Sequence, residues 1–98
     1  MTLTFGIEIE TTGIPFDVVG NKLRERGIKG CKSVYDGTPS VDAEIVTPVL
    51  ALCQISKEYI ETLCSALDGI GCRINRACGL HVHIGNAPLA DTTHAARF

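Results

Sequence analysis

The sequence lacks the features that mark several large classes of protein. It has no excess of positive charge, because nine Lys and Arg stand against eleven Asp and Glu and give a net charge of -2. A basic surface that could hold a nucleic-acid backbone or an anionic membrane is therefore not expected. No apolar run approaches the roughly 20 residues that a membrane-spanning helix needs, and the first residues lack the basic start of a secretory signal. We therefore expect a cytoplasmic protein without nucleic-acid or membrane partners.

The cysteines also lack a pairing pattern. There are five, an odd number, and none of them forms a C-x-x-C motif. A disulfide framework is not expected, and the cysteines are interpreted mainly as small apolar residues. A chain of 98 residues with 45% hydrophobic and 20% charged residues has the size and balance of one folded domain, residues 1–98.

Alternation of apolar and polar residues predicts the strands. Residues 3–10 alternate strictly, with Glu8 and Glu10 on the polar face, and residues 80–84 do the same. Weaker extended stretches are expected at residues 28–32, 33–35, 43–47 and 72–74. An Asp-Gly turn lies between the second and third of these.

Helical spacing predicts two helices and the start of a third. The first covers residues 16–23 between Pro15 and Gly27. The second begins near residue 56, has Tyr59, Ile60, Leu63, Cys64 and Leu67 on its apolar face, and ends at Gly69 in a left-handed cap. Residues 86–98 are typical of the start of another helix. Together the elements predict an α+β fold, with a mainly antiparallel sheet, helices on one face and a polar opposite face.

Glu8 and Glu10 form the first candidate site. Side chains at i and i+2 of a strand point the same way, about 7 Å apart, so both carboxylates could bind one metal ion or a pair of ions. The alternative is an edge strand in which glutamates serve only to keep the protein soluble.

His81 and His83 form the second candidate site. Imidazoles held at fixed separation by a strand suit a metal ion, and Gly79 and Gly85 on either side allow a ligand to approach closely. The alternative is a polar strand face that meets only solvent.

Two further acids complete the candidates. Glu44 is a single acid among apolar neighbours, so it must face water, a cation or a hydrogen-bond donor. Asp36 belongs to the Asp-Gly turn and is typical of a turn former, but it is kept as a candidate.

If the strands pair in one sheet, the acids and histidines could converge on one face. Carboxylates with imidazole suit Mg²⁺ or Mn²⁺. The converging set is Glu8, Glu10, Glu44, His81 and His83. The alternative is a structural zinc site, although its spacing, C-x5-C-x2-H-x-H, fits no usual zinc knuckle. Its ligands would be Cys72, Cys78, His81 and His83.

These segments together resemble the amidoligase family, which belongs with the glutamine synthetase-like carboxylate-amine ligases. The resemblance is carried, in order, by residues 5–10, 36–37, 44–48 and 78–85. It implies a glutamine synthetase-like catalytic half that joins a small-molecule or peptide carboxylate to an amine. The reaction would use ATP and Mg²⁺ or Mn²⁺ and would pass through an acyl phosphate.

The resemblance also implies a role for each matching residue. Glu8 and Glu10 correspond to the metal ligands of the first strand, and Glu44 to the acidic ligand of a later strand. His81 and His83 correspond to histidines that face metal or phosphate. Asp36 would help to place the amine or a metal.

The resemblance leaves the nucleotide-binding residues open. Members of the family are typically much longer, so this chain is expected to be the N-terminal part of a longer domain, active if complemented by a second segment. Arg73 and Arg76 could contact ATP phosphates, or they could be solvated surface residues. An unfinished sheet edge is expected to be covered by a homo-oligomer or a complementing chain.

Two other functions stay open at this point. The first is a non-catalytic module that binds a divalent cation or a partner subunit through the exposed sheet. The second is a metallohydrolase that uses the histidine pair to activate water.

Overall fold

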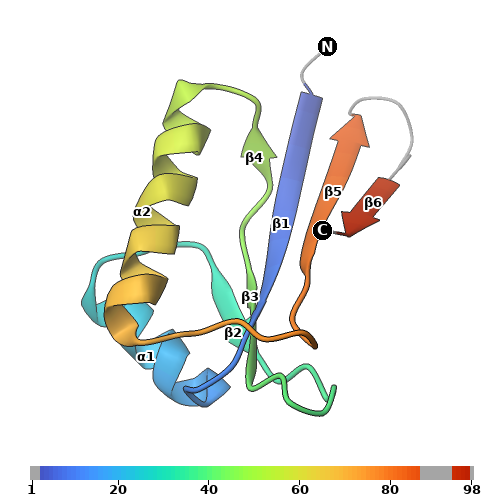
Figure 1. Ribbon diagram of the computed structural model, residues 1–98. Helices are drawn as coiled ribbons and strands as arrows, with labels where there is room; N and C mark the ends of the chain where they lie inside the picture. The colour runs from blue at the N-terminus through green and yellow to red at the C-terminus, as the bar shows by residue number, and fades with distance from the viewer. Residues whose placement is uncertain (1–2, 87–93, 98) are drawn as a thin grey trace.

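The structure is an α+β fold built on one antiparallel sheet, as the alternation of apolar and polar residues predicts. The computed structural model describes residues 3–86 and 94–97 (Figure 1). The elements are β1 (Leu3–Thr11), α1 (Phe16–Glu25), β2 (Lys32–Val34), β3 (Ala43–Val46), β4 (Leu50–Ala51), α2 (Gln54–Ile70), β5 (Leu80–Asn86) and β6 (His94–Arg97). The strand order is β2-β3-β1-β5-β6, and β4 pairs with β1.

The core lies between the sheet and the two helices, which cover the same face of the sheet (Figure 1). The largest fully buried side chains are Val19 and Leu23 of α1, Ile45 of β3 and Leu63 of α2. Burial of each such side chain stabilises the fold by about 1.5–3 kcal/mol. The opposite face of the sheet carries no helix in the described part of the chain, and we call it the open face.

The helix ends agree with the sequence in α1 and differ from it in α2. α1 follows Pro15 and is followed by Gly27 at a φ of 78°. The predicted left-handed cap at Gly69 is wrong, because α2 continues to Ile70 and Gly71 adopts the cap, at a φ of 103°. The Gly71 N–H donates to the carbonyls of Leu67 and Asp68, which extends the helix past Gly69.

The predicted apolar face of α2 is also slightly rotated. Leu63 and Leu67 are buried, as expected, together with Ser56 and Ala66. Cys64 is exposed, so its assignment to the buried face is wrong. Its side chain falls just outside the stripe that packs on the sheet.

Several extended stretches are shorter than predicted. The stretches at 28–32 and 33–35 reduce to β2, and residues 72–74 form only one bridge, between Arg73 and Thr12. β4 was not predicted, and the helix predicted over 86–98 is wrong at residues 94–97, which form β6 against β5. The remainder of that stretch, residues 87–93 and 98, lies outside the described residues.

β3 and β4 run along the same side of β1 and are separated by a bulge. Glu8 pairs with Val46, but Phe5 pairs with Leu50, so three residues, 47–49, stand opposite Gly6 and Ile7. An extra residue of this kind bends a strand and is common beside functional sites. Neither of the two described helices is long and apolar enough to cross a membrane.

Candidate metal centre

The candidate residues meet on the open face of the sheet because of the strand register. Glu8 of β1 stands opposite His81 of β5, and Glu10 of β1 stands opposite Glu44 of β3. Paired residues of antiparallel strands point to the same face, with Cβ atoms about 5 Å apart. Three strands therefore deliver their acids and histidines to one place.

Glu8 is the centre of a histidine cluster. His81 Nδ1 lies 3.2 Å and His83 Nε2 lies 2.9 Å from the same oxygen, Glu8 Oε1. An ionised carboxylate can only accept hydrogen bonds, so each of these nitrogens acts as the donor. The hydrogen bond from His83, followed in effect by that from His81, holds the pKa of Glu8 below its usual value despite partial burial.

Glu44 has the opposite electrostatic environment. Partial burial, together with the charges of Glu8, Asp36 and Glu10, raises the pKa of its carboxyl group. A carboxylate surrounded by other carboxylates binds either a proton or a cation. A cation bound beside Glu44 would therefore lower the pKa of its carboxyl group again.

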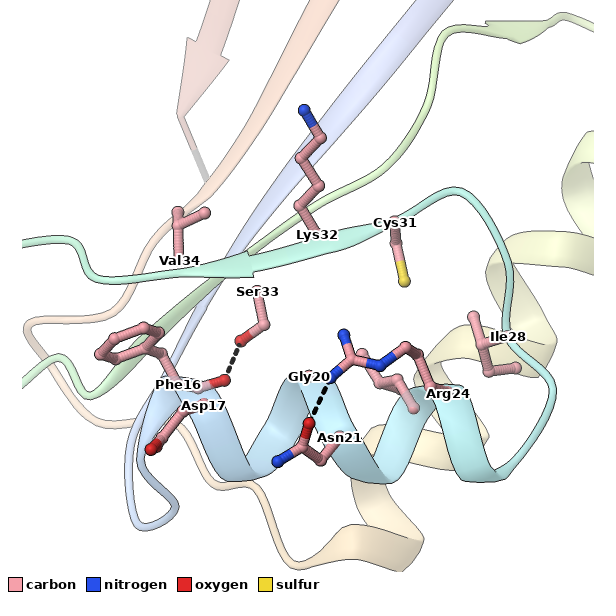
Figure 2. A pocket seen from close by; sticks show the side chains of 11 residues that line it. Phe16, Asp17, Gly20, Asn21, Arg24, Ile28, Cys31, Lys32, Ser33 and Val34 are labelled. Carbon is pink, nitrogen blue, oxygen red and sulfur yellow. Dashed lines mark hydrogen bonds between the residues drawn. The ribbon is translucent and has the colours of Figure 1, made fainter.

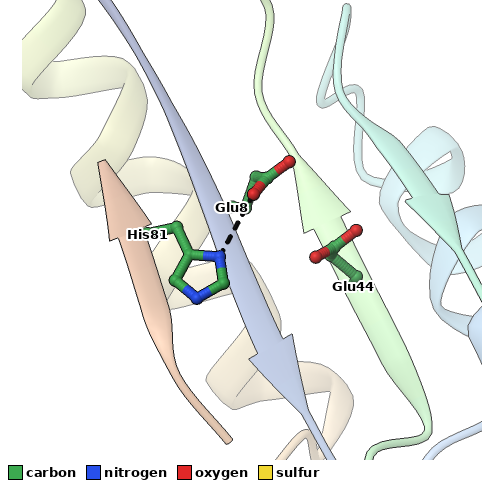
Figure 3. A group of neighbouring side chains, drawn as sticks. All are labelled: Glu8, Glu44 and His81. Atoms are coloured by element: carbon green, nitrogen blue, oxygen red, sulfur yellow. Dashed lines mark hydrogen bonds and ion pairs between the residues drawn. The ribbon is translucent and has the colours of Figure 1, made fainter. Parts of the chain in front are cut away.

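Two groups of three side chains have ligand atoms within 4.8 Å of one another. One consists of Glu8, Glu44 and His81, which Figure 3 shows facing one another from three neighbouring strands. The other consists of Glu10, Asp36 and Glu44. Glu44 belongs to both groups, so it could bridge a pair of cations or complete a site for one.

Glu10 and Asp36 are held in place by backbone donors. Glu10 is only 3% exposed, and its Oε1 accepts a 2.6 Å hydrogen bond from the Gly79 N–H. Asp36 Oδ2 accepts a 3.1 Å hydrogen bond from the Thr38 N–H, and the Thr38 contacts lower the pKa of Asp36. Asp36 is therefore both a turn former and a member of the cluster.

The donor set fits a hard divalent cation. Its two groups contain four carboxylates and one imidazole, and oxygen donors of this kind suit Mg²⁺ or Mn²⁺. His83 belongs to neither group and instead orients Glu8 from beside it. The alternative zinc set does not assemble, since neither Cys72 nor Cys78 joins a ligand group among the described residues.

The two arginines singled out from the sequence lie elsewhere. Arg73 pairs through its backbone with Thr12. A Cβ added to Gly13 would lie 3.5 Å from Arg73 Nε, so this guanidinium lies beside Gly13. Arg76 is exposed in the turn before β5. The phosphate-binding role of both arginines stays a prediction.

Lys32 is a cation on the open face that the sequence pattern did not single out. A hollow of about 380 Å³ lies between α1 and β2. Figure 2 shows that Ser33 is directed toward α1 and Lys32 away from it. One row of paired backbone positions crosses the sheet from β2 to β6. In order, it contains Lys32, Val46, Glu8, His81 and Arg97. Basic residues therefore occupy both ends of the row of backbone positions that crosses the sheet through Glu8. The sequence alone does not place Lys32 in this row, because β2 is short and its register with β3 must be known.

Comparisons with known proteins identify the family. The family model described as "Putative amidoligase enzyme" matches residues 28–97, which contain every site residue except Glu8 and Glu10 of β1. No curated protein and no solved structure matches the chain. The match covers well over half of the chain and includes Asp36, Glu44 and the histidine strand. The chain therefore belongs to the amidoligase family, whose description indicates a ligase-type function.

Proposed function

We propose that this protein is a cytoplasmic carboxylate-amine ligase that depends on ATP and on Mg²⁺ or Mn²⁺. The observation that carries the proposal is the convergence of four carboxylates and a histidine pair on one open sheet face. Family membership supports ligase chemistry in particular, and the acidic donor set supports a hard cation. The substrates would be a small-molecule or peptide carboxylate and an amine.

The proposed reaction has two steps. A substrate carboxylate oxygen attacks the γ-phosphorus of ATP, and the bond from phosphorus to the β-phosphate oxygen breaks, which yields ADP and an acyl phosphate. The amine nitrogen then bonds to the acyl carbon, and inorganic phosphate leaves as the amide forms. Bound divalent cations would neutralise the charge that develops on the phosphate oxygens.

The chain's own residues have distinct parts in this proposal. Glu8, Glu10 and Glu44 would hold the cations with His81, and Asp36 would place the amine. The attacking nitrogen must lose a proton, and we assign its acceptance to His83. His83 Nε2 is engaged with Glu8 at 2.9 Å, which leaves Nδ1 to accept the proton while the Glu8 carboxylate stabilises the imidazolium.

Lys32 would contact the phosphates. Adjacent strands are about 4.8 Å apart, so the Lys32 backbone lies roughly 10 Å from that of Glu8, a gap that an extended lysine and a cation-bound phosphate can bridge. Phosphate is well matched to a lysine ammonium group. Arg73 and Arg76 remain alternatives, and a set of single substitutions separates the three residues.

The test is trapping of the acyl phosphate. The purified chain is incubated with ATP, Mg²⁺, a panel of carboxylates and hydroxylamine, which converts acyl phosphates to hydroxamates. We expect hydroxamate and ADP to form in equal amounts with at least one carboxylate. Glu44→Gln should abolish both products, whereas Glu25→Gln, on the exposed surface of α1, should leave both unchanged.

The same assay separates the competing functions. Metal binding without ADP release, even after a complementing chain is added, would favour a non-catalytic binding module. Amide hydrolysis without nucleotide would favour a metallohydrolase. Lys32→Met should raise the ATP concentration needed for ADP and hydroxamate formation while leaving Mn²⁺ binding intact. The same change in Arg73→Met would show that Arg73 also contacts the phosphates.

A further inference from the structure

A hollow beside the candidate metal centre extends the open face toward the start of β1. Its volume is about 340 Å³, at the small end of the range for ligand sites. It shares Glu8 and His83 with the cluster. The remaining lining residues are Thr4, Phe5, Gly6, Val49 and Gly85. A molecule in this hollow would have one end at the cluster.

Two of the strand positions that line the hollow carry no side chain. Gly6 stands opposite His83, and Gly85 stands opposite Thr4. A Cβ added to Gly6 would meet only Thr47 Oγ1 within 4 Å, at 3.9 Å, so the space above Gly6 is open. A Cβ on Gly85 would come within 3.0 Å of Thr4 Oγ1, so glycine at this position leaves room for the Thr4 side chain.

One wall comes from the bulge between β3 and β4. The extra residue opposite Gly6 brings Val49 to the edge of the hollow, where Val49 is 78% exposed. An apolar side chain this exposed is available to contact a ligand. The hollow is thus apolar at the Val49 end, whereas Glu8 and His83 make the other end ionic.

We propose that this hollow binds the apolar part of the substrate carboxylate, whose carboxylate group lies at the Glu8 and His83 end. This inference rests on the proposed function, since a cation held by Glu8 and Glu44 would attract the substrate carboxylate. It specifies the substrate class: a carboxylate with a short aliphatic body. Gly6 then limits specificity, because any side chain there would occupy the place of the substrate body.

The test measures binding of simple carboxylates without turnover. The ¹⁵N-labelled chain with Mg²⁺ is titrated with acetate, butyrate and hexanoate while amide shifts are followed. We expect affinity to rise about two- to fourfold for each added methylene. Complete burial of a CH₂ group corresponds to about fourfold, and partial burial to less. The largest shifts should fall on the amides of Gly6, Gly85 and Val49.

Gly6→Val supplies the decisive variant. Valine suits a strand, and the open space above Gly6 admits it, so the variant is expected to fold. It should keep its Mg²⁺ response and lose the dependence on chain length. Gly20→Val, in α1 on the other face of the sheet, is the matched control and should keep both properties.

Three outcomes would overturn the proposal: no dependence on chain length, shifts centred away from the hollow, or unchanged hexanoate affinity in Gly6→Val. Adenosine shifting the same amides more strongly than hexanoate would also overturn it, since the hollow would then be a base site. The proposed function fails separately. If binding depends on chain length but no hydroxamate or ADP forms, the hollow binds carboxylates and the ligase function is wrong. If ADP release is the same in Gly6→Val as in the parent, the ligase function stands and the assignment of the hollow is wrong.

Discussion

The two faces of the central sheet are made by the same strands and serve opposite purposes. In β3, Ile45 is fully buried against the helices, while its neighbour Glu44 lies among acids on the open face. In β1, Ile9 packs against the core, while Glu8 and Glu10 join the cluster. One face stabilises the fold through burial, whereas the other gathers acids, of which Glu44 opposes folding when it is ionised. The same strands therefore carry the core on one side and the acids that we propose as metal ligands on the other.

The largest effect should come from the helix-covered face. Leu63→Ala removes a fully buried side chain and should lower the free energy of unfolding by about 2–5 kcal/mol, through lost burial and the cavity left behind. Urea denaturation measures the change. Leu52→Ala, at a position 69% exposed, is the control and should cost under about 1 kcal/mol. Equal losses in the two variants would contradict this assignment of the core.

On the open face, Glu44→Gln should act in opposite directions with and without metal. The raised pKa of Glu44 means that its contribution to stability is present at low pH and is lost as pH rises through that pKa. Without metal at neutral pH, the variant should therefore be more stable than the parent.

With Mn²⁺ at a hundred times its dissociation constant, the parent should gain about 2.7 kcal/mol, and Glu44→Gln should lose most of this gain. Thermal unfolding with EDTA or Mn²⁺ measures both effects. Glu25→Gln should behave like the parent throughout. A full metal response in Glu44→Gln would show that Glu44 is not a ligand.

Two glycines at the end of α2 should respond differently to alanine. Gly71→Ala places a side chain at a φ of 103° and should cost about 1 kcal/mol. Gly69→Ala improves helix propensity but approaches the flexible end of Arg26 at 3.0 Å, so its effect should stay within about 1 kcal/mol and not exceed that of Gly71→Ala. Circular dichroism during urea titration measures the free energy of unfolding of both variants. A larger loss of stability in Gly69→Ala than in Gly71→Ala would show that Gly69 is the cap residue.

The subtlest effect concerns the acid limb of stability. The pKa of Glu8 is lowered chiefly by the His83 hydrogen bond, so its contribution is present above the unfolded-state pKa and is lost as pH falls through the folded value. His83→Ala should move the pKa of Glu8 up toward its usual value. NMR titration of the carboxyl carbons measures this shift. Asp42, whose pKa is lowered by the Gly13 N–H, is the internal control and should not move.

Strict alternation was enough to predict β1 and β5 and the direction of their acids and histidines. Residues Leu3 to Glu10 and Leu80 to Ile84 carry a full period-two pattern, which fixes both the element and its faces. Their pairing stayed a condition, because alternation does not say which strands are neighbours in the sheet. The convergence of Glu8 with His81 was predicted only on that condition, and the register of β1 with β5 meets it.

Other features depend on pairing that no local pattern carries. β6 forms by pairing with β5, and the two-residue β4 forms by pairing with β1 beyond a bulge. Neither segment has an alternation of apolar and polar residues long enough to predict a strand. The open-face position of Lys32 follows only from its register with Val46. The hollow above Gly6 likewise requires the bulge, and a single glycine in a strand pattern does not reveal it.

Paramagnetic broadening by Mn²⁺ in the amide spectrum of the metal-free chain would show whether the acids of the open face hold a cation. Substoichiometric Mn²⁺ is expected to broaden amides around Glu8, Glu44 and His81 first, while those of Leu23 and Leu63 on the helix-covered side remain sharp. Uniform broadening, or broadening centred on acids of the helices such as Asp17 or Glu61, would show that the cation does not bind at these residues.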